Sequence, residues 1–172
     1  QDLQKFKYKL TGAIPAATEK DLAELGIKMY HQSPKFLDEN TLSVEGKTVK
    51  AKKIVIATGN KPMPLKIPGA ELMLNSDDFL ELEKLPESMI FIGAGYIGME
   101  FAHIAARLGV EVTMIDTEPR PLSNFDEDMV AHLTDASEKI GIKFIFNAKA
   151  SKVEKLRKYL RVTTETKDGE EV

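Results

Sequence analysis

The second half of the chain alternates short apolar runs with longer segments in which apolar residues recur every three or four positions. From Met89 to Asn147, the runs MIFIG, VEVTMID and IKFIFN are typical of buried strands, and the segments between them have helical spacing. Gly109 and Gly141 each follow a predicted helix, where glycine commonly ends one. Strands that alternate with helices in this way predict an α/β domain with a parallel sheet.

Residues 1–60 have a different pattern. We expect a helix over TEKDLAELG, with Thr18 as its N-terminal cap and Gly26 at its end. Four short alternating segments follow, IKMYHQ, KFLDEN, TLSVEG and KTVKAK, and turn residues at Asn40 and Gly46 separate the last three. These segments predict a small antiparallel meander. The continuous run KIVIATG that comes next is typical of a strand buried on both faces.

A proline-rich stretch between residues 60 and 88 predicts a crossing segment between two domains, residues 1–60 and residues 61–172. One short helix fits within it at SDDFLELEKL, where Ser76 can cap the first turn. After the α/β pattern, the segments AKASKVEKL and YLRVTTET read as two strands, which we expect to pair antiparallel.

Composition narrows the classes of function. The 24 Lys and Arg residues are mixed with 27 Asp and Glu residues, so no basic stripe indicates a nucleic-acid partner. No apolar run approaches the roughly 20 residues of a membrane span. The sequence has no cysteine, which fits a reducing compartment such as the cytoplasm. It opens without Met and closes on a strand-like run, so we expect a piece of a longer polypeptide, truncated at both ends.

Three glycines stand between the first strand and helix of the α/β pattern, with the spacing G-x-G-x-x-G. Gly93 permits a tight turn, Gly95 leaves room for the backbone to approach a diphosphate, and Gly98 lets the helix pack closely on the strand. The start of that helix offers unpaired N–H groups and the positive end of its dipole. Asp116 ends the next strand, 18 residues beyond the last glycine (116 − 98), where a carboxylate can reach the adenosine ribose.

The alternative is that these glycines serve only turns and packing. We favour a dinucleotide, because the glycine loop follows a strand, opens a helix and is completed by an acid. Asp116 favours NAD over NADP, since one unit of phosphate charge ~4 Å from a carboxylate costs about 4 kcal/mol at a surface-like dielectric. Arg120, four residues further on (120 − 116), is a candidate contact to the adenine or a solvated loop charge, rather than a phosphate ligand.

These residues resemble the pyridine nucleotide–disulfide oxidoreductases, the flavoprotein family of glutathione reductase, dihydrolipoamide dehydrogenase and mercuric reductase. The resemblance is carried by IVIATGNKPMPLKIPG, LPESMIFIGAGYIGMEFA and VTMIDTEPRPLSNFDEDMV, and more weakly by TGAIPAATEKDLAELGI. It covers nearly all of the chain. It implies a Rossmann-like NAD-binding domain over residues 61–172, preceded by a remnant of the FAD-binding domain with its meander and its Ala-Thr-Gly strand.

The resemblance also implies roles for individual residues. Thr58 and Gly59 would lie near the flavin, with strand termination as the alternative for Thr58. Tyr96 would gate the nicotinamide pocket, and Glu100 would match the acid near the nicotinamide; the alternatives are packing for the tyrosine and a favourable contact with the helix dipole for the acid. The loop and first helical turn that would hold the dinucleotide comprise Gly93, Ala94, Gly95, Tyr96, Ile97 and Gly98.

The implied activity of the whole protein is transfer of a hydride from NADH to FAD and onward to a disulfide. The family's redox-active Cys pair and first FAD motif would precede this chain, and its dimerisation domain would follow. We therefore expect no catalytic residue and no metal ligand here, and His31, His103 and His132 match no catalytic motif. The expected partners are a nicotinamide dinucleotide and the remaining domains, in a homodimer. Two alternatives stay open: an NADH oxidase or ferredoxin reductase-type flavoenzyme without a Cys pair, and a nucleotide-sensing module without chemistry.

Overall fold

The structure is a computed structural model that describes residues 2–166 and 169–171, with side chains through residue 166. The chain divides into two compact units, Gln1–Lys61 and Pro62–Val172. In the part of the chain that is described, no helix has both the length and the apolar character needed to cross a bilayer.

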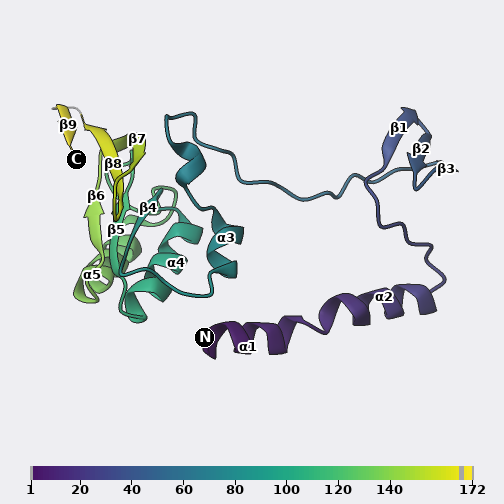
Figure 1. Ribbon diagram of the computed structural model, residues 1–172, viewed down its shortest axis with the longest axis horizontal. Helices are drawn as coiled ribbons and strands as arrows, with labels where there is room; N and C mark the ends of the chain where they lie inside the picture. Colours follow the sequence, from purple (N-terminus) through teal and green to yellow (C-terminus); the bar gives the residue numbers. More distant parts are fainter. Residues whose placement is uncertain (1, 167–168, 172) are drawn as a thin grey trace. The chain divides into compact units, whose positions relative to one another are not determined.

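The first unit begins with two helices, α1 (Asp2–Thr11) and α2 (Ile14–Glu24), at the purple end of the chain in Figure 1. The predicted cap at Thr18 is wrong, because α2 begins four residues earlier (18 − 14) and carries Pro15 in its first turn. Proline is well tolerated there, since the N–H that it lacks has no acceptor within the helix. Gly26, with φ of +73°, follows the end of α2 as predicted.

The predicted meander is confirmed. Strands β1 (Lys35–Asp38), β2 (Thr41–Val44) and β3 (Lys47–Lys50) pair antiparallel in the order β1-β2-β3. The two residues between β2 and β3, Glu45 and Gly46, both have positive φ, +50° and +70°. This is the backbone conformation of a type I′ turn, whose twist matches that of the strands it joins.

Two segments of the first unit do not form the strands that their apolar residues predict. IKMYHQ and KIVIATG have no regular structure, and Val55 and Ile56 expose 87% and 72% of their surface. A strand needs a neighbour for its backbone N–H and C=O groups, and its propensity is expressed only on a packed surface. No strand among the described residues pairs with the KIVIATG run, so the predicted Ala-Thr-Gly strand is wrong for this structure.

The second unit contains the predicted alternation of strands and helices (Figure 1). Its elements follow in the order β4 (Ser88–Ile92), α4 (Tyr96–Arg107), β5 (Glu111–Ile115), α5 (Glu127–Lys139) and β6 (Lys143–Ile145). The three strands are parallel, in the order β4-β5-β6. The fold class predicted from the sequence, Rossmann-like α/β with a small meander, is confirmed.

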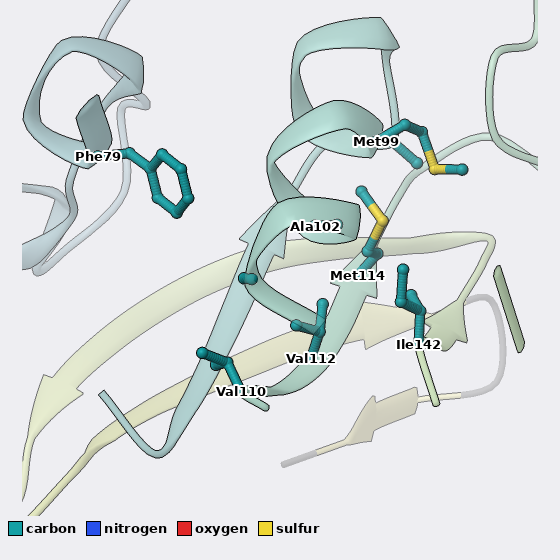
Figure 2. Packing of buried hydrophobic residues seen from close by; sticks show 9 residues of the cluster. Phe79, Met99, Ala102, Val110, Val112, Met114 and Ile142 are labelled. Carbon is teal, nitrogen blue, oxygen red and sulfur yellow. The ribbon is translucent and has the colours of Figure 1, made fainter. Parts of the chain in front are cut away.

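The core of this unit forms where α4 packs on the central strand β5 (Figure 2). Val112 and Met114 of β5 are fully buried, and so are Ala102 and Ala105 of α4. The small alanine side chains let the helix lie close to the sheet, and Met99 adds apolar bulk to the same cluster. Burying a side chain of the size of valine or methionine contributes about 1.5–3 kcal/mol. These contacts therefore fix α4, and with it the glycine turn that precedes it.

A short helix, α3 (Ser76–Glu81), precedes the parallel sheet. The predicted cap at Ser76 is wrong: the cap is Asn75, whose side chain accepts hydrogen bonds from the N–H groups of Asp77 and Asp78 at 2.8 and 3.2 Å. The side chain of Asp78 accepts in turn from the N–H of Asn75 at 2.9 Å, which completes a capping box. Asn75 is therefore bonded at both its side chain and its backbone.

Strands β7 (Ala148–Lys155), β8 (Leu160–Thr166) and β9 (Gly169–Glu171) form an antiparallel sheet in the order β7-β8-β9. The predicted pairing of the two strand-like segments after the α/β pattern is thus confirmed. The 3₁₀ helix η1 (Ala70–Leu72) contacts β7, and β7 also contacts β5.

A polar contact links α4 to α5. Nε2 of His103 lies 2.8 Å from Oγ of Ser137, whose hydroxyl donates to the carbonyl oxygen of Leu133 at 2.6 Å. Because a hydroxyl has one hydrogen, Ser137 accepts the N–H of the imidazole. Burial, and then the positive charge of Arg107, lowers the pKa of His103. The folded protein therefore favours the neutral ring.

This arrangement predicts a loss of stability in mild acid. The unfolded chain takes up a proton at the ordinary imidazole pKa of about 6.5, whereas folded His103 does so at lower pH. The contribution is thus fully present above about pH 6.5 and is lost as the pH falls from there through the lowered pKa. The measurement is the free energy of unfolding in urea, taken at several pH values across this window. As the pH falls, His103→Gln should lose less stability than the unaltered chain. His132→Gln, exposed on α5, should keep the full acid sensitivity, and equal losses in all three proteins would contradict the prediction.

Candidate nucleotide-binding site

The three glycines after β4 differ in backbone conformation and in the space around them. Gly93 has φ of +100°, a conformation that favours glycine, and its N–H donates to the carbonyl of Ile115 at 2.8 Å. Gly95 is extended, and a Cβ placed on it would meet nothing within 4 Å. A Cβ on Gly98 would lie 2.4 Å from the carbonyl oxygen of Gly93. The turn therefore leaves open space at its second glycine and a close backbone approach at its third.

Helix α4 starts at this turn without a side-chain cap at Gly95. The first four N–H groups of an α-helix have no acceptor within the helix, and its N-terminus carries a partial positive charge. Tyr96 and Ile97 are exposed on the first turn, and Glu100 is exposed just beyond it. The helix start is therefore accessible, and amide donors and a positive dipole end are the features that bind phosphate groups.

Asp116, directly after β5, points its carboxylate at the glycine turn. Its Oδ2 accepts a hydrogen bond from the N–H of Ala94 at 2.5 Å, and its Oδ1 accepts from the N–H of Glu118 at 2.9 Å. Its backbone is also fixed, because its N–H donates to Ile145 and its carbonyl accepts from Ala148. The acid and the glycine turn, 22 residues apart in sequence, are thus brought together as predicted.

The loop after β5 holds Ala94 from a second side. The N–H of Leu122 donates to the carbonyl oxygen of Ala94 at 3.0 Å. Leu122 has φ of +49°, which is uncommon for a residue with a branched side chain. Ala94 itself is buried, with 1% of its surface exposed. Both polar groups of its backbone are therefore bonded to the loop, one through Asp116 and one through Leu122.

Arg120 points into this loop. Its guanidinium donates to the carbonyl oxygens of Pro121 and Leu122 at 3.4 and 3.1 Å, and to those of Ser123 and Phe125 at 2.9 and 3.0 Å. All four acceptors are backbone groups within five residues of the arginine. The positive charge is thus engaged by its own loop in this structure, a role that the sequence did not indicate.

The remaining predicted site residues lie in the first unit. Thr58 is exposed in the irregular segment after β3, and Gly59 has φ of +72°. The described residues around Thr58 form neither a sheet nor a helix start that could hold the diphosphate of FAD, so a flavin beside them would have to be held by further polypeptide. Among the residues described, no group of three His, Asp or Glu side chains is arranged to hold a metal ion.

Leu122 and the carbonyl of Ala94 were missed by the sequence analysis. A leucine carries no sequence signal for positive φ, and a backbone carbonyl contributes through its position alone. Asp116 was found because the glycine spacing identified the loop that its carboxylate reaches. The arrangement supplies N–H donors, a helix dipole and a carboxylate, which are suited to binding; redox chemistry would come from a bound cofactor.

A parallel sheet, an open glycine turn at the start of a helix and an acid after the next strand define the second unit as a Rossmann-type α/β domain. Comparison with known proteins assigns nearly the whole sequence to one family. The chain belongs to the family described as Pyridine nucleotide-disulphide oxidoreductase, which it matches over residues 8–172.

Curated relatives include oxidoreductases with different substrates. The chain is 33% identical to a dihydrolipoyl dehydrogenase 2 of Haloarcula marismortui, over 96% of this chain and 37% of that protein. It is 36% identical to a mercuric reductase of Bacillus cereus, over 76% of this chain and 21% of that protein. It is 38% identical to a glutathione reductase of Burkholderia cepacia, over 77% of this chain and 30% of that protein. The chain thus spans between about a fifth and two fifths of the length of these relatives.

Solved structures support the fold. The chain superimposes on the HOCl-induced flavoprotein disulfide reductase RclA from Escherichia coli with a TM-score of 0.85 and 23% sequence identity. The match covers 98% of this chain and 39% of that structure. At this identity the likeness establishes the fold.

Proposed function

We propose that this chain is the NAD(H)-binding portion of a FAD-dependent pyridine nucleotide–disulfide oxidoreductase, in which a hydride passes from NADH to FAD and onward to a disulfide. The open space at Gly95 is the observation that carries the proposal. A Cβ placed there would meet nothing within 4 Å, and the position lies at the start of α4. Space beside a helix start is what a diphosphate needs to approach the backbone.

In the proposed complex, the backbone from Gly93 to Gly98 holds the diphosphate and Asp116 holds the adenosine ribose. An ionised carboxylate has about four lone-pair sites. The N–H groups of Ala94 and Glu118 use two of them, so sites remain for the ribose hydroxyls. Bound NADH supplies the hydride, and the protein's part is to hold and orient the dinucleotide. In the same proposal Tyr96, which is 62% exposed on the first turn of α4, gates the nicotinamide.

We infer that the site prefers NADH to NADPH. The carboxylate of Asp116 would face the additional phosphate of NADPH, and the guanidinium of Arg120, the nearest arginine in the sequence, donates to four backbone carbonyls. Two negative charges ~4 Å apart, with no compensating cation, repel each other by about 4 kcal/mol at a surface-like dielectric, before screening by salt. Glu118, exposed two residues beyond Asp116, adds a second negative charge.

The test is a titration of the purified chain with NADH and with NADPH, followed by the fluorescence of the dinucleotide. The chain contains no tryptophan that would interfere with it. NADH should bind at least about tenfold more tightly than NADPH. Asp116→Asn should bring the ratio of the two dissociation constants toward one. The ratio is the informative quantity, because this substitution also disturbs the hydrogen bond to Ala94 and should weaken both dinucleotides.

Glu118→Gln is the matched control. It removes the same charge and keeps the backbone N–H that Asp116 accepts, so it should change the ratio far less. Tighter binding of NADPH by the unaltered chain would refute the cofactor preference. Failure of both dinucleotides to bind would refute the proposed function itself.

We assign residues 1–60 to the FAD-binding domain of the whole protein, with Thr58 and Gly59 near the flavin. The large exposed fractions of Val55 and Ile56 suit a segment that is covered by further polypeptide. In the same proposal, the remaining domains complete a homodimer.

A further inference from the structure

We infer that Arg120 is a positioning residue for the dinucleotide: by holding the loop after β5, it fixes the peptide groups of Ala94 between the first two glycines. The inference rests on the proposed function. It assigns to Arg120 an indirect role through Leu122, in place of direct contact with a phosphate or the adenine.

The first step is the contact between the arginine and its loop. Two nitrogens of the guanidinium together reach four carbonyl oxygens, the furthest at 3.4 Å. A planar guanidinium presents several donors in a fixed geometry, so it can bind several carbonyls of a curved segment together. Lysine carries a single ammonium and cannot reproduce this arrangement.

The second step is the conformation that the arginine supports. One of its acceptors is the carbonyl of Leu122, whose φ of +49° is in the left-handed region. A leucine adopts this conformation only where its surroundings impose it. Arg120 also donates to the carbonyls of the residues on either side of Leu122, which are Pro121 and Ser123. It therefore supplies a large part of that constraint.

The third step connects the loop to the site. The N–H of Leu122 donates to Ala94, whose own N–H donates to Asp116. Ala94 lies between Gly93 and Gly95, so rotation of its peptide groups would move the space in which a diphosphate is proposed to lie. If the loop relaxes without Arg120, only a fraction of the molecules hold the turn correctly, and the apparent affinity falls to that fraction of its full value.

The experiment compares Arg120→Lys and Arg120→Ala with the unaltered chain, using NADH, NADPH and ADP-ribose as probes. Both variants should weaken all three ligands by about tenfold, which corresponds to one correctly held molecule in ten. The NADPH-to-NADH ratio should stay unchanged, because no direct phosphate contact is lost. Millimolar guanidinium should restore part of the affinity of Arg120→Ala. Amide hydrogen exchange at Leu122 and Ala94 should accelerate, while that of β5 stays slow.

Arg157→Ala, exposed in the turn between β7 and β8, is the matched control for loss of an arginine and should show none of these effects. Unchanged affinity in both Arg120 variants would overturn the inference, and so would a selective loss of NADPH binding, which indicates direct phosphate contact. If the unaltered chain binds neither NADH nor ADP-ribose, the proposed function fails and the inference fails with it.

Discussion

Gly95→Ala should weaken NADH binding by about ten- to a hundredfold while leaving the fold intact. The backbone at this position has φ of −74°, which any residue adopts, and an added methyl group would meet no protein atom within 4 Å. The free energy of unfolding should therefore change by less than about 0.5 kcal/mol. The methyl group would fill the space assigned to the diphosphate, and overpacking of this kind costs about 1–3 kcal/mol, at 1.4 kcal/mol for each tenfold in affinity.

Gly98→Ala provides the contrast. Its Cβ would lie 2.4 Å from the backbone oxygen of Gly93, which cannot move without distorting the turn. Alanine gains about 1 kcal/mol over glycine within a helix, but the clash costs about 1–3 kcal/mol. The net effect should be a loss of stability, measured by circular dichroism in urea, together with weaker binding. If Gly95→Ala binds NADH as tightly as the unaltered chain, the open space is not where the diphosphate lies.

The α/β half of the fold could be predicted because its determinants are local. The apolar runs of β4, β5 and β6 and the helical spacing of α4 and α5 lie within single elements. Gly109 and Gly141, with φ of +88° and +92°, end the two helices as predicted. The burial of β5 agrees with its central position in the sheet, since Val112 and Met114 are buried on one face and Ile115 on the other.

The errors occurred where the outcome depends on a partner or on a choice between neighbours. The KIVIATG run has strand propensity, but a strand forms only when another strand pairs with it. Asn75 and Ser76 are both good N-caps, and the hydrogen bond from the N–H of Asn75 to the side chain of Asp78 selects the first. Thr18 lies inside α2 and does not cap it, because α2 begins at Ile14 and carries Pro15 in its first turn.

The meeting of the glycine turn with the acid could be predicted, and the hydrogen bonds that join them could not. The spacing from Gly93 to Asp116 indicates that the turn and the acid meet, and the structure brings them together. The acid was expected to reach the adenosine ribose, and its hydrogen bond from the N–H of Ala94 was not predicted. The role of Arg120 depends on where four carbonyls of a curved loop point, which follows from the tertiary structure.

Gly69→Ala should be the most destabilising single substitution considered for the second unit, with a loss of about 3–5 kcal/mol. Gly69 has φ of +81°, and its Cβ would clash with the backbone carbonyl of Val153 in β7. A left-handed conformation costs a non-glycine residue about 1–3 kcal/mol, and the clash adds about 1–3 kcal/mol. Relieving the clash would lift the turn from β7 and break the 2.9 Å hydrogen bond from Val153 to Pro68, worth about 1 kcal/mol.

Gly109→Ala separates the cost of the left-handed backbone conformation from the cost of the clash. Its φ of +88° is close to that of Gly69, but a Cβ there meets nothing within 4 Å. Both substitutions restrict the unfolded chain equally, by about 0.4–1 kcal/mol, so this effect cancels in the comparison. In urea unfolding, Gly109→Ala should lose about 1 kcal/mol, and the additional loss in Gly69→Ala measures the contact with β7. Hydrogen exchange should then accelerate at Val153 in Gly69→Ala alone. Equal losses in the two variants would mean that the turn at Gly69 yields freely, and that η1 is not anchored to β7 through it.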